Sequence, residues 1–154
     1  MNPLKWFLGR KRPVQVLLVV AAIAGLLLLY WLASPLWTTV QGNDAPPDAT
    51  EVSRGAFSGL AGHQASGDAI LLRGGDGSYI VRTESFSVTN GPDIHVWLSD
   101  SPASVSGGVD LGSVRATLGS ANYAVPAGVD PTQYGYVLIW CNPFAVPFGQ
   151  AAMS

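Results

Sequence analysis

Three residues of this chain have side chains suited to redox or metal chemistry: Cys141, His63 and His95. Cys141 is the only cysteine, so it cannot form a disulfide within the chain. It ends an apolar run, residues 136–141, and no lysine, arginine or histidine lies near it in sequence to activate the thiol. This pattern leaves open a buried core residue, a reactive thiol, a metal or cofactor ligand, and a disulfide-linked dimer through Cys141.

Two histidines and one thiolate are also the ligand set of a trigonal copper site, with Met153 as a conceivable weak axial ligand. In the cupredoxin pattern, the cysteine, the second histidine and the methionine follow one another in one short loop. Here only an asparagine and a proline, residues 142–143, follow Cys141 directly. The spacing therefore argues against copper, and the alternatives are a surface-strand role for His95 and a loop role for His63.

The acidic and serine residues give little support to hydrolysis. Residues 119–122 lack a nucleophile elbow, and no Gly-x-Ser-x-Gly motif follows a strand. Asp93 and Asp110 follow or precede glycine-containing turns, and neither is paired with another carboxylate at a readable spacing. We therefore expect an accessory module rather than a turnover enzyme.

Aromatic side chains are numerous for a small domain. They are Tyr79, Trp97, Tyr123, Tyr134, Tyr136 and Trp140. Exposed together, they would form a platform for a glycan or a peptide; otherwise they serve core and sheet packing. The platform defines the alternative function, an adhesion or ligand-binding domain with Cys141 in its core.

An apolar segment near the N-terminus predicts a membrane anchor. Residues 14–33 contain no charged side chain, and these twenty residues form a helix about 30 Å long, the thickness of a hydrocarbon core. The basic residues before it are Lys5, Arg10, Lys11 and Arg12. The next charged residue is Asp44, and this asymmetry keeps the N-terminus in the cytoplasm. We predict a transmembrane helix over residues 14–36 behind a cytoplasmic tail, residues 1–13, with Trp6, Phe7, Tyr30, Trp31 and Trp37 at the interfaces.

A cleaved signal peptide is the alternative to this anchor. The apolar run is longer than the roughly 7–15 residues of a signal peptide, residues 40–42 form a poor cleavage site, and Pro35 spoils a site after Ser34. In both cases the C-terminal domain lies outside the cytoplasm, in the periplasm or the extracellular space. From Asp44 onward the chain has ten acidic residues and four arginines, which argues against nucleic-acid binding.

The remainder of the chain predicts one exported all-β domain. Residues 37–52 have few apolar side chains and two adjacent prolines, and we expect a solvated linker there. Residues 53–154 have the size of a single domain and contain short apolar runs separated by turn residues, which is typical of a β-sandwich or barrel. Residues 69–73 and 78–82 flank the glycine-rich residues 74–77, which predicts a hairpin.

Alternation predicts the orientation of the later strands. In residues 85–89, Phe86 and Val88 should point inward. Residues 94–99 should place His95 and Trp97 on the face opposite the aliphatic side chains. Residues 136–141 are apolar on both faces and predict a central strand, whereas Pro147 favours an edge strand for residues 144–148.

Several ordered blocks of the chain resemble the electron-transfer DM-thirteen domain. They are residues 55–57, 63, 66–69, 86 and 90–98 in its first half, and residues 109–112, 122–126 and 136–148 in its second half. The resemblance spans about residues 53–153. It implies a β-sandwich-like extracellular module of the kind found in bacteria and, beside DOMON domains, in animal matrix proteins.

The resemblance also implies electron transfer or redox activity centred on Cys141, with haem as a candidate cofactor. The chain departs from the family pattern at residues 114–117 and at residues 142–143, where an expected charged residue after the cysteine is missing. We therefore expect a membrane-anchored redox module with Cys141 as its central residue and Cys141, His63 and His95 as candidate cofactor ligands. The candidate cofactors are haem and copper, and the candidate partner is a redox or cell-surface protein.

Overall fold

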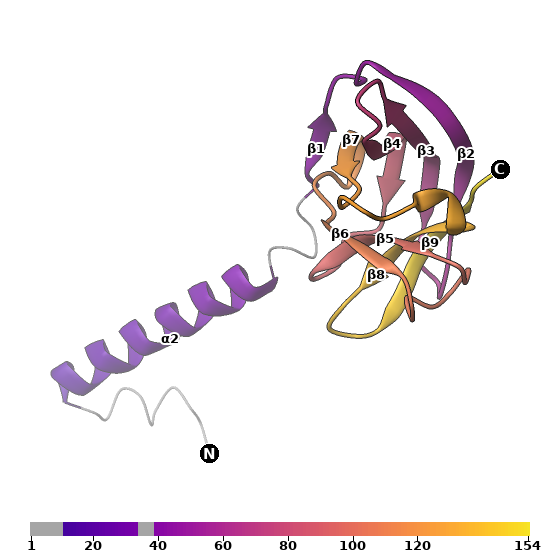
Figure 1. Cartoon of the computed structure of the whole chain (residues 1–154). Coiled ribbons are helices and arrows are strands. Elements are labelled where there is room, and N and C mark those ends of the chain that lie inside the picture. The colour runs from indigo at the N-terminus through magenta and orange to yellow at the C-terminus, as the bar shows by residue number, and fades with distance from the viewer. Residues whose placement is uncertain (1–10, 34–38) are drawn as a thin grey trace. The chain divides into compact units, whose positions relative to one another are not determined.

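The computed structural model describes residues 11–33 and 39–154, and the chain divides into two compact units, Met1–Trp37 and Thr38–Ser154. The first unit contains helix α2 (Arg12–Ala33; Figure 1). Within it, residues Arg12–Trp31 are long and apolar enough to cross a membrane, and none of that stretch is buried. A signal sequence meets the same description, so the helix agrees with both predictions.

Some predictions about the N-terminal segment lie outside the described residues. These are the basic side chains of Lys5 and Arg10, the interfacial aromatics Trp6, Phe7 and Trp37, and the cleavage site at Ser34 and Pro35.

The second unit is a single nine-stranded β-sheet, which confirms the predicted all-β class. Its strands are β1 (Gln41–Asn43), β2 (Ala49–Gly59), β3 (Ala65–Gly74), β4 (Tyr79–Val88), β5 (Ile94–Ser99), β6 (Val109–Ser113), β7 (Leu118–Ala124), β8 (Tyr136–Cys141) and β9 (Val146–Ala152). A short 3-10 helix, η2 (Pro131–Gln133), precedes β8. The strand order is β1-β7-β4-β3-β2-β9-β8-β5-β6.

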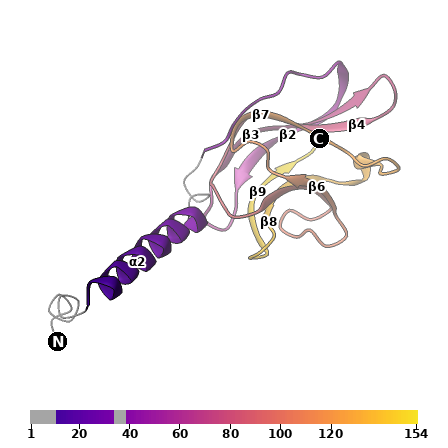
Figure 2. The same ribbon diagram turned by 90° about the vertical axis from the view of Figure 1, so that its left-hand side faces the viewer.

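The sheet curls into a half-barrel instead of forming the separate sheets of a sandwich. Strand β2 belongs to both halves, because its residues 49–56 pair with β3 and its residues 57–59 pair with β9. A register shift interrupts the β2–β3 ladder between Glu51 and Ser53, and such bulges increase the local bend of a strand. Figures 1 and 2 show the two halves facing each other across the core.

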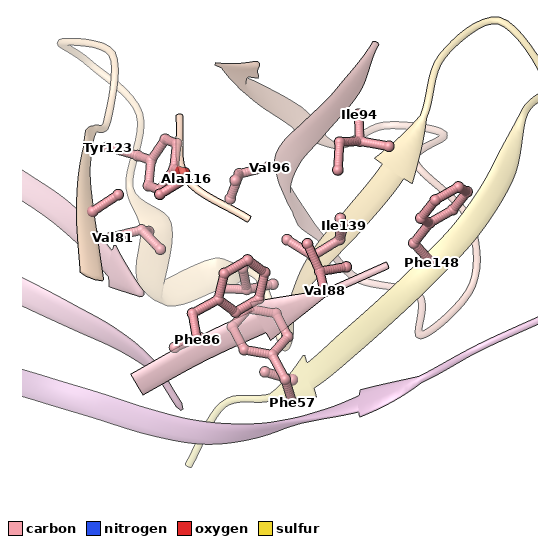
Figure 3. Packing of buried hydrophobic residues seen from close by; sticks show 14 of the residues in the cluster. Phe57, Val81, Phe86, Val88, Ile94, Val96, Ala116, Tyr123, Ile139 and Phe148 are labelled. Carbon is pink, nitrogen blue, oxygen red and sulfur yellow. The ribbon is translucent and has the colours of Figure 1, made fainter. Parts of the chain in front are cut away.

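The core fills the inner face of this curl. Phe57 and Phe86, from β2 and β4, have ring centroids 4.9 Å apart, and Ile139 approaches them from the opposite half (Figure 3). Phe86, Val81, Val96 and Ile139 are fully buried. Burying a side chain of this size stabilises the fold by about 1.5–3 kcal/mol, so this face holds the two halves together.

The predicted hairpin and inward-facing residues are confirmed. Strands β3 and β4 pair antiparallel across the turn at residues 74–78, and Phe86 and Val88 are buried. The segments 78–82 and 85–89 form one strand, β4, interrupted by a bulge at which Ser85 has a φ of 48°.

The prediction of an edge strand at Pro147 is wrong. Strand β9 lies between β2 and β8. Pro147 is tolerated because β2 pairs only with residues 149–151 of β9, so no partner on that side requires an N–H group at position 147. On the other side Pro147 adjoins a register shift in the β8–β9 ladder.

The segment that we expected to be a solvated linker, residues 37–52, contributes to the sheet. Within it, β1 pairs parallel with β7, and β2 begins at Ala49. The buried guanidinium of Arg82 on β4 donates to the backbone oxygen of Asp44 at 3.0 Å and to Oδ1 of Asn122 at 2.9 Å. A buried guanidinium needs such acceptors, which fixes this segment against the outer face of the sheet.

Candidate functional site

Cys141 lies at the end of the central strand β8 and points into the core. It pairs with Ile94 of β5, and its side chain is fully buried among the apolar residues of the inner face. Its thiol donates a hydrogen bond to the backbone oxygen of Pro92, with an Sγ–O distance of 3.2 Å. A backbone oxygen can only accept a hydrogen bond, so this contact uses the S–H group as its donor.

The turn at Pro92–Asp93 covers this end of β8. Beside the bond to the thiol, the backbone oxygen of Asp93 accepts a hydrogen bond from the N–H of Asn142 at 3.2 Å. Asp93 has a φ of 50°, in the left-handed region that few residues other than glycine adopt at low cost. A Cβ on the preceding Gly91 would lie 2.6 Å from the ring of Phe148, so glycine lets the chain pass close to the core here.

His95 lies on the opposite face of the sheet from Cys141, as the alternation of β5 predicts. Its Nδ1 is 2.9 Å from each carboxylate oxygen of Asp110 on β6, and its Nε2 is 3.0 Å from Oδ1 of Asp93. The hydroxyl of Ser113 lies 3.1 Å from the same Nε2. The side chain of His95 is 16% exposed.

The carboxylates of Asp93 and Asp110 favour the protonated, positively charged form of the His95 ring. Burial lowers the pKa of His95, but hydrogen bonds with Asp110 and then Asp93, together with their charges, outweigh it and raise the pKa above its ordinary value. The sequence interpretation assigned Asp93 and Asp110 only turn roles. Asp110 does cap a turn, since its Oδ1 accepts from the N–H of Gly112 at 2.8 Å, but its pairing with His95 was missed. Asp93 and His95 are two residues apart, and this spacing was the available signal.

His63 lies in the turn between β2 and β3 and is part of neither arrangement. Its ring stacks on Phe148 with a centroid distance of 3.6 Å and an interplanar angle of 11°. The loop role that we considered for His63 agrees with this position.

The three candidate ligands do not converge on one site. Cys141 points into the core, the nitrogens of His95 face carboxylates on the outer surface, and His63 stacks on an aromatic ring. Over residues 11–33 and 39–154, no group of three or more His, Cys, Asp or Glu side chains is placed to hold a metal ion. These residues therefore do not fit a copper site or a shared set of haem ligands.

None of the six aromatic residues singled out in the sequence is fully exposed. Tyr123 is buried in the core, and its hydroxyl accepts a hydrogen bond from the N–H of Arg115 at 3.0 Å. The remaining five are partly buried: Tyr79, Trp97, Tyr134, Tyr136 and Trp140. Trp140 lies directly opposite His95 across the β5–β8 ladder.

Comparison with known proteins identifies the family of this domain. Neither the curated proteins nor the solved structures gave a match. The family model described as Electron transfer DM13 matches residues 56–153, which span strands β3 to β9 and the C-terminal end of β2. The match covers more than half of the chain and includes Cys141, Pro92 and both histidines. The chain therefore belongs to the Electron transfer DM13 family, and this membership assigns it an electron-transfer-related role.

Proposed function

We propose that this protein is a single-pass membrane protein that holds an electron-transfer domain outside the cytoplasm, with Cys141 as the redox-active group. The family membership carries the electron-transfer part of this proposal. The remaining parts concern the anchor and the thiol, and each rests on its own observation.

The anchor is supported by helix α2. Its apolar stretch, Arg12–Trp31, has the length of a membrane span, and Lys11 and Arg12 stand at its N-terminal end. Positive charge on that side favours a cytoplasmic N-terminus, which sends the β domain across the membrane. We expect the full chain to stay in the membrane after an alkaline carbonate wash. Recovery of a shortened chain in the soluble fraction, beginning after α2, would instead identify a cleaved signal peptide.

The role of Cys141 is supported by its position and by its hydrogen bond. It is the one thiol of the chain, it lies at the end of a strand, and a two-residue turn covers it. Conversion to a mixed disulfide replaces the S–H proton, so it removes the donor to the oxygen of Pro92. The oxidation state of Cys141 is therefore coupled to the turn that covers it.

Reversible oxidation of the full chain in detergent micelles tests this role. Oxidised glutathione converts a thiol to a mixed disulfide and releases one reduced glutathione, and the adduct is counted by mass spectrometry. We expect folded protein to form the adduct faster than it unfolds globally, and a reductant to remove the adduct. The Cys141→Ala variant is the matched control and should form no adduct. Modification only at the rate of global unfolding would show that Cys141 is a core residue.

Complete burial of Cys141 favours a second candidate function, a ligand-binding domain in which this cysteine only packs the core. Free cysteine is among the most buried residue types, and the environment of Cys141 is apolar. On this candidate, Cys141→Ala leaves function intact and lowers only stability. Binding of the full chain to a glycan array, unchanged in that variant, would support it.

A further inference from the structure

Two side chains compete for one nitrogen of His95. Nε2 is 3.0 Å from a carboxylate oxygen of Asp93 and 3.1 Å from the hydroxyl of Ser113. A carboxylate can only accept a hydrogen bond, so its contact requires a proton on Nε2. A hydroxyl can also donate, so Ser113 is able to bond to the same nitrogen after the proton has left.

Asp93 connects His95 with the cover of Cys141. Its carboxylate meets the ring, while its backbone oxygen accepts from the N–H of Asn142, next to the cysteine. The preceding residue, Pro92, accepts the hydrogen bond of the thiol. The unfavourable left-handed backbone of Asp93 makes this turn dependent on such contacts.

We propose that protonated His95 is a positioning residue that holds the Pro92–Asp93 turn over Cys141, and that loss of its ring proton frees the turn and exposes the thiol. This inference deepens the proposed function, on which its significance rests, because it supplies a control on access to the redox group. The hydrogen bonds of His95 go to Asp93, Asp110 and Ser113, and not to the sulfur of Cys141. His95 acts through Asp93.

Asp93 is the partner that a neutral ring would release. Asp110 meets Nδ1 through both carboxylate oxygens, and the N–H of Gly112 fixes its Oδ1. The single N–H of a neutral ring is therefore retained on Nδ1, and the lone pair on Nε2 faces Asp93. Ser113 then donates to that lone pair, and the carboxylate of Asp93, already 54% exposed, turns to water.

Among the described residues, Asp93 and Asp110 are the charged groups that act on the His95 ring. Asp93 precedes β5 and Asp110 lies on β6, while the neighbour across the ladder on β8 is the uncharged Trp140. We call the contact of protonated His95 with Asp93, which holds the turn, the clasp. Because the pKa of His95 is raised in the folded protein, the clasp is complete below the unfolded pKa of about 6.5, and it is lost as the pH rises through the folded pKa. Access to Cys141 should increase over the same interval.

The test is the alkylation rate of Cys141 by iodoacetamide in the full chain in detergent micelles, from about pH 5.5 to about pH 9. At each pH the rate is divided by that of the urea-denatured chain, which removes the intrinsic ionisation of the thiol. We expect this ratio to rise several-fold for the wild type as the pH passes through the folded pKa of His95. A ratio that is independent of pH would overturn the clasp.

Two variants separate the clasp from a general loosening of the fold. Asp93→Asn tolerates the left-handed backbone but removes the charge, so its ratio should not change with pH. Ser113→Ala removes the competing donor to neutral His95, so the midpoint of the rise should move to higher pH. Circular dichroism confirms that each variant is folded, and a wild-type pH dependence in folded Asp93→Asn would also overturn the proposal.

The outcome is distinguishable from that of the redox proposal. Alkylation reports access to the thiol alone, whereas the glutathione experiment reports reversible oxidation. A pH-dependent ratio with a thiol that glutathione never oxidises supports the clasp and removes the redox role. A constant ratio with reversible oxidation overturns only the clasp.

Discussion

The two faces of the paired strands β5 and β8 differ in what holds their side chains. On the inner face Ile94 and Cys141 lie opposite each other in an apolar core, and the thiol has one hydrogen-bond partner, a backbone oxygen. On the outer face His95 and Trp140 lie opposite each other, and the histidine is bonded to two carboxylates and a hydroxyl. Apolar packing therefore holds the side chains of the inner face, whereas charge and protonation hold His95 on the outer face. The two kinds of environment are only one residue apart along each strand.

This difference implies that the faces respond to different perturbations. The inner face should be sensitive to lost volume, because its side chains are buried and apolar. The outer face should be sensitive to pH and less sensitive to lost volume. The Pro92–Asp93 turn connects the two faces. The backbone oxygen of Pro92 bonds to Cys141 on the inner face, and the carboxylate of Asp93 bonds to His95 on the outer face.

The largest expected effect is on the inner face. Ile139→Ala removes a fully buried side chain of β8 and should lower the free energy of unfolding by about 2–5 kcal/mol. Urea denaturation of the full chain in micelles measures it. Phe144→Ala, at a side chain that is 68% exposed in the β8–β9 turn, is the control and should change stability by no more than about 0.5 kcal/mol. Equal effects of the two variants would contradict the assignment of this face to the core.

Cys141→Ser should have the next largest effect. The hydroxyl keeps a donor for the oxygen of Pro92 but brings a more polar group into an apolar site, which should cost about 1–3 kcal/mol. Comparison with Cys141→Ala in the same denaturation experiment separates polarity from volume. A serine variant as stable as the wild type would show that water reaches this position.

His95→Gln should have a smaller effect that depends on pH. The raised pKa of His95 means that its charge stabilises the folded wild type below about pH 6.5, and that this contribution disappears as the pH rises through the folded pKa. The stability difference between wild type and variant should therefore be on the order of 0.5–1 kcal/mol at about pH 6 and decrease towards about pH 9. A difference that grew with pH would show that the ring is neutral in the folded protein.

The smallest expected effect is the difference between Asp93 and Asp110 in how much each raises the pKa of His95. Asp110→Asn should lower the pKa of His95 more than Asp93→Asn does, because Asp110 contacts the ring through two oxygens and is itself fixed by Gly112. NMR titration of the imidazole in both variants measures this order. The reverse order would identify Asp93 as the stronger partner and weaken the argument that Asp93 is released first.

Much of the fold follows from short-range patterns. Alternation in residues 94–99 placed the aliphatic side chains inward and His95 and Trp97 on the other face, and the apolar run at residues 136–141 indicated a central strand. The glycine-rich residues 74–77 indicated the hairpin. Each pattern works because neighbouring residues of a strand point to opposite faces and glycine permits tight turns.

The prediction failed where the outcome depends on a distant partner. Pro147 indicated an edge, but the short pairing of β2 with β9 leaves that position without a demand for an N–H group. Residues 37–52 resemble a linker in composition, yet the buried Arg82 draws Asp44 onto the sheet. The local sequence shows neither which backbone oxygen the Arg82 guanidinium reaches nor how many residues of β2 pair with β9.

The sequence alone therefore determined several of the strands and their faces, the apolar helix and the solitary thiol, since these depend on residue types at close spacing. Only the tertiary structure decided which groups meet. It brought Asp110 to His95 across 15 residues and the oxygen of Pro92 to Cys141 across 49 residues. Such meetings depend on strand order and register, and several pairings satisfy the same local pattern of alternation. The family match gives the domain its electron-transfer-related role, and these long-range contacts determine how its thiol is covered.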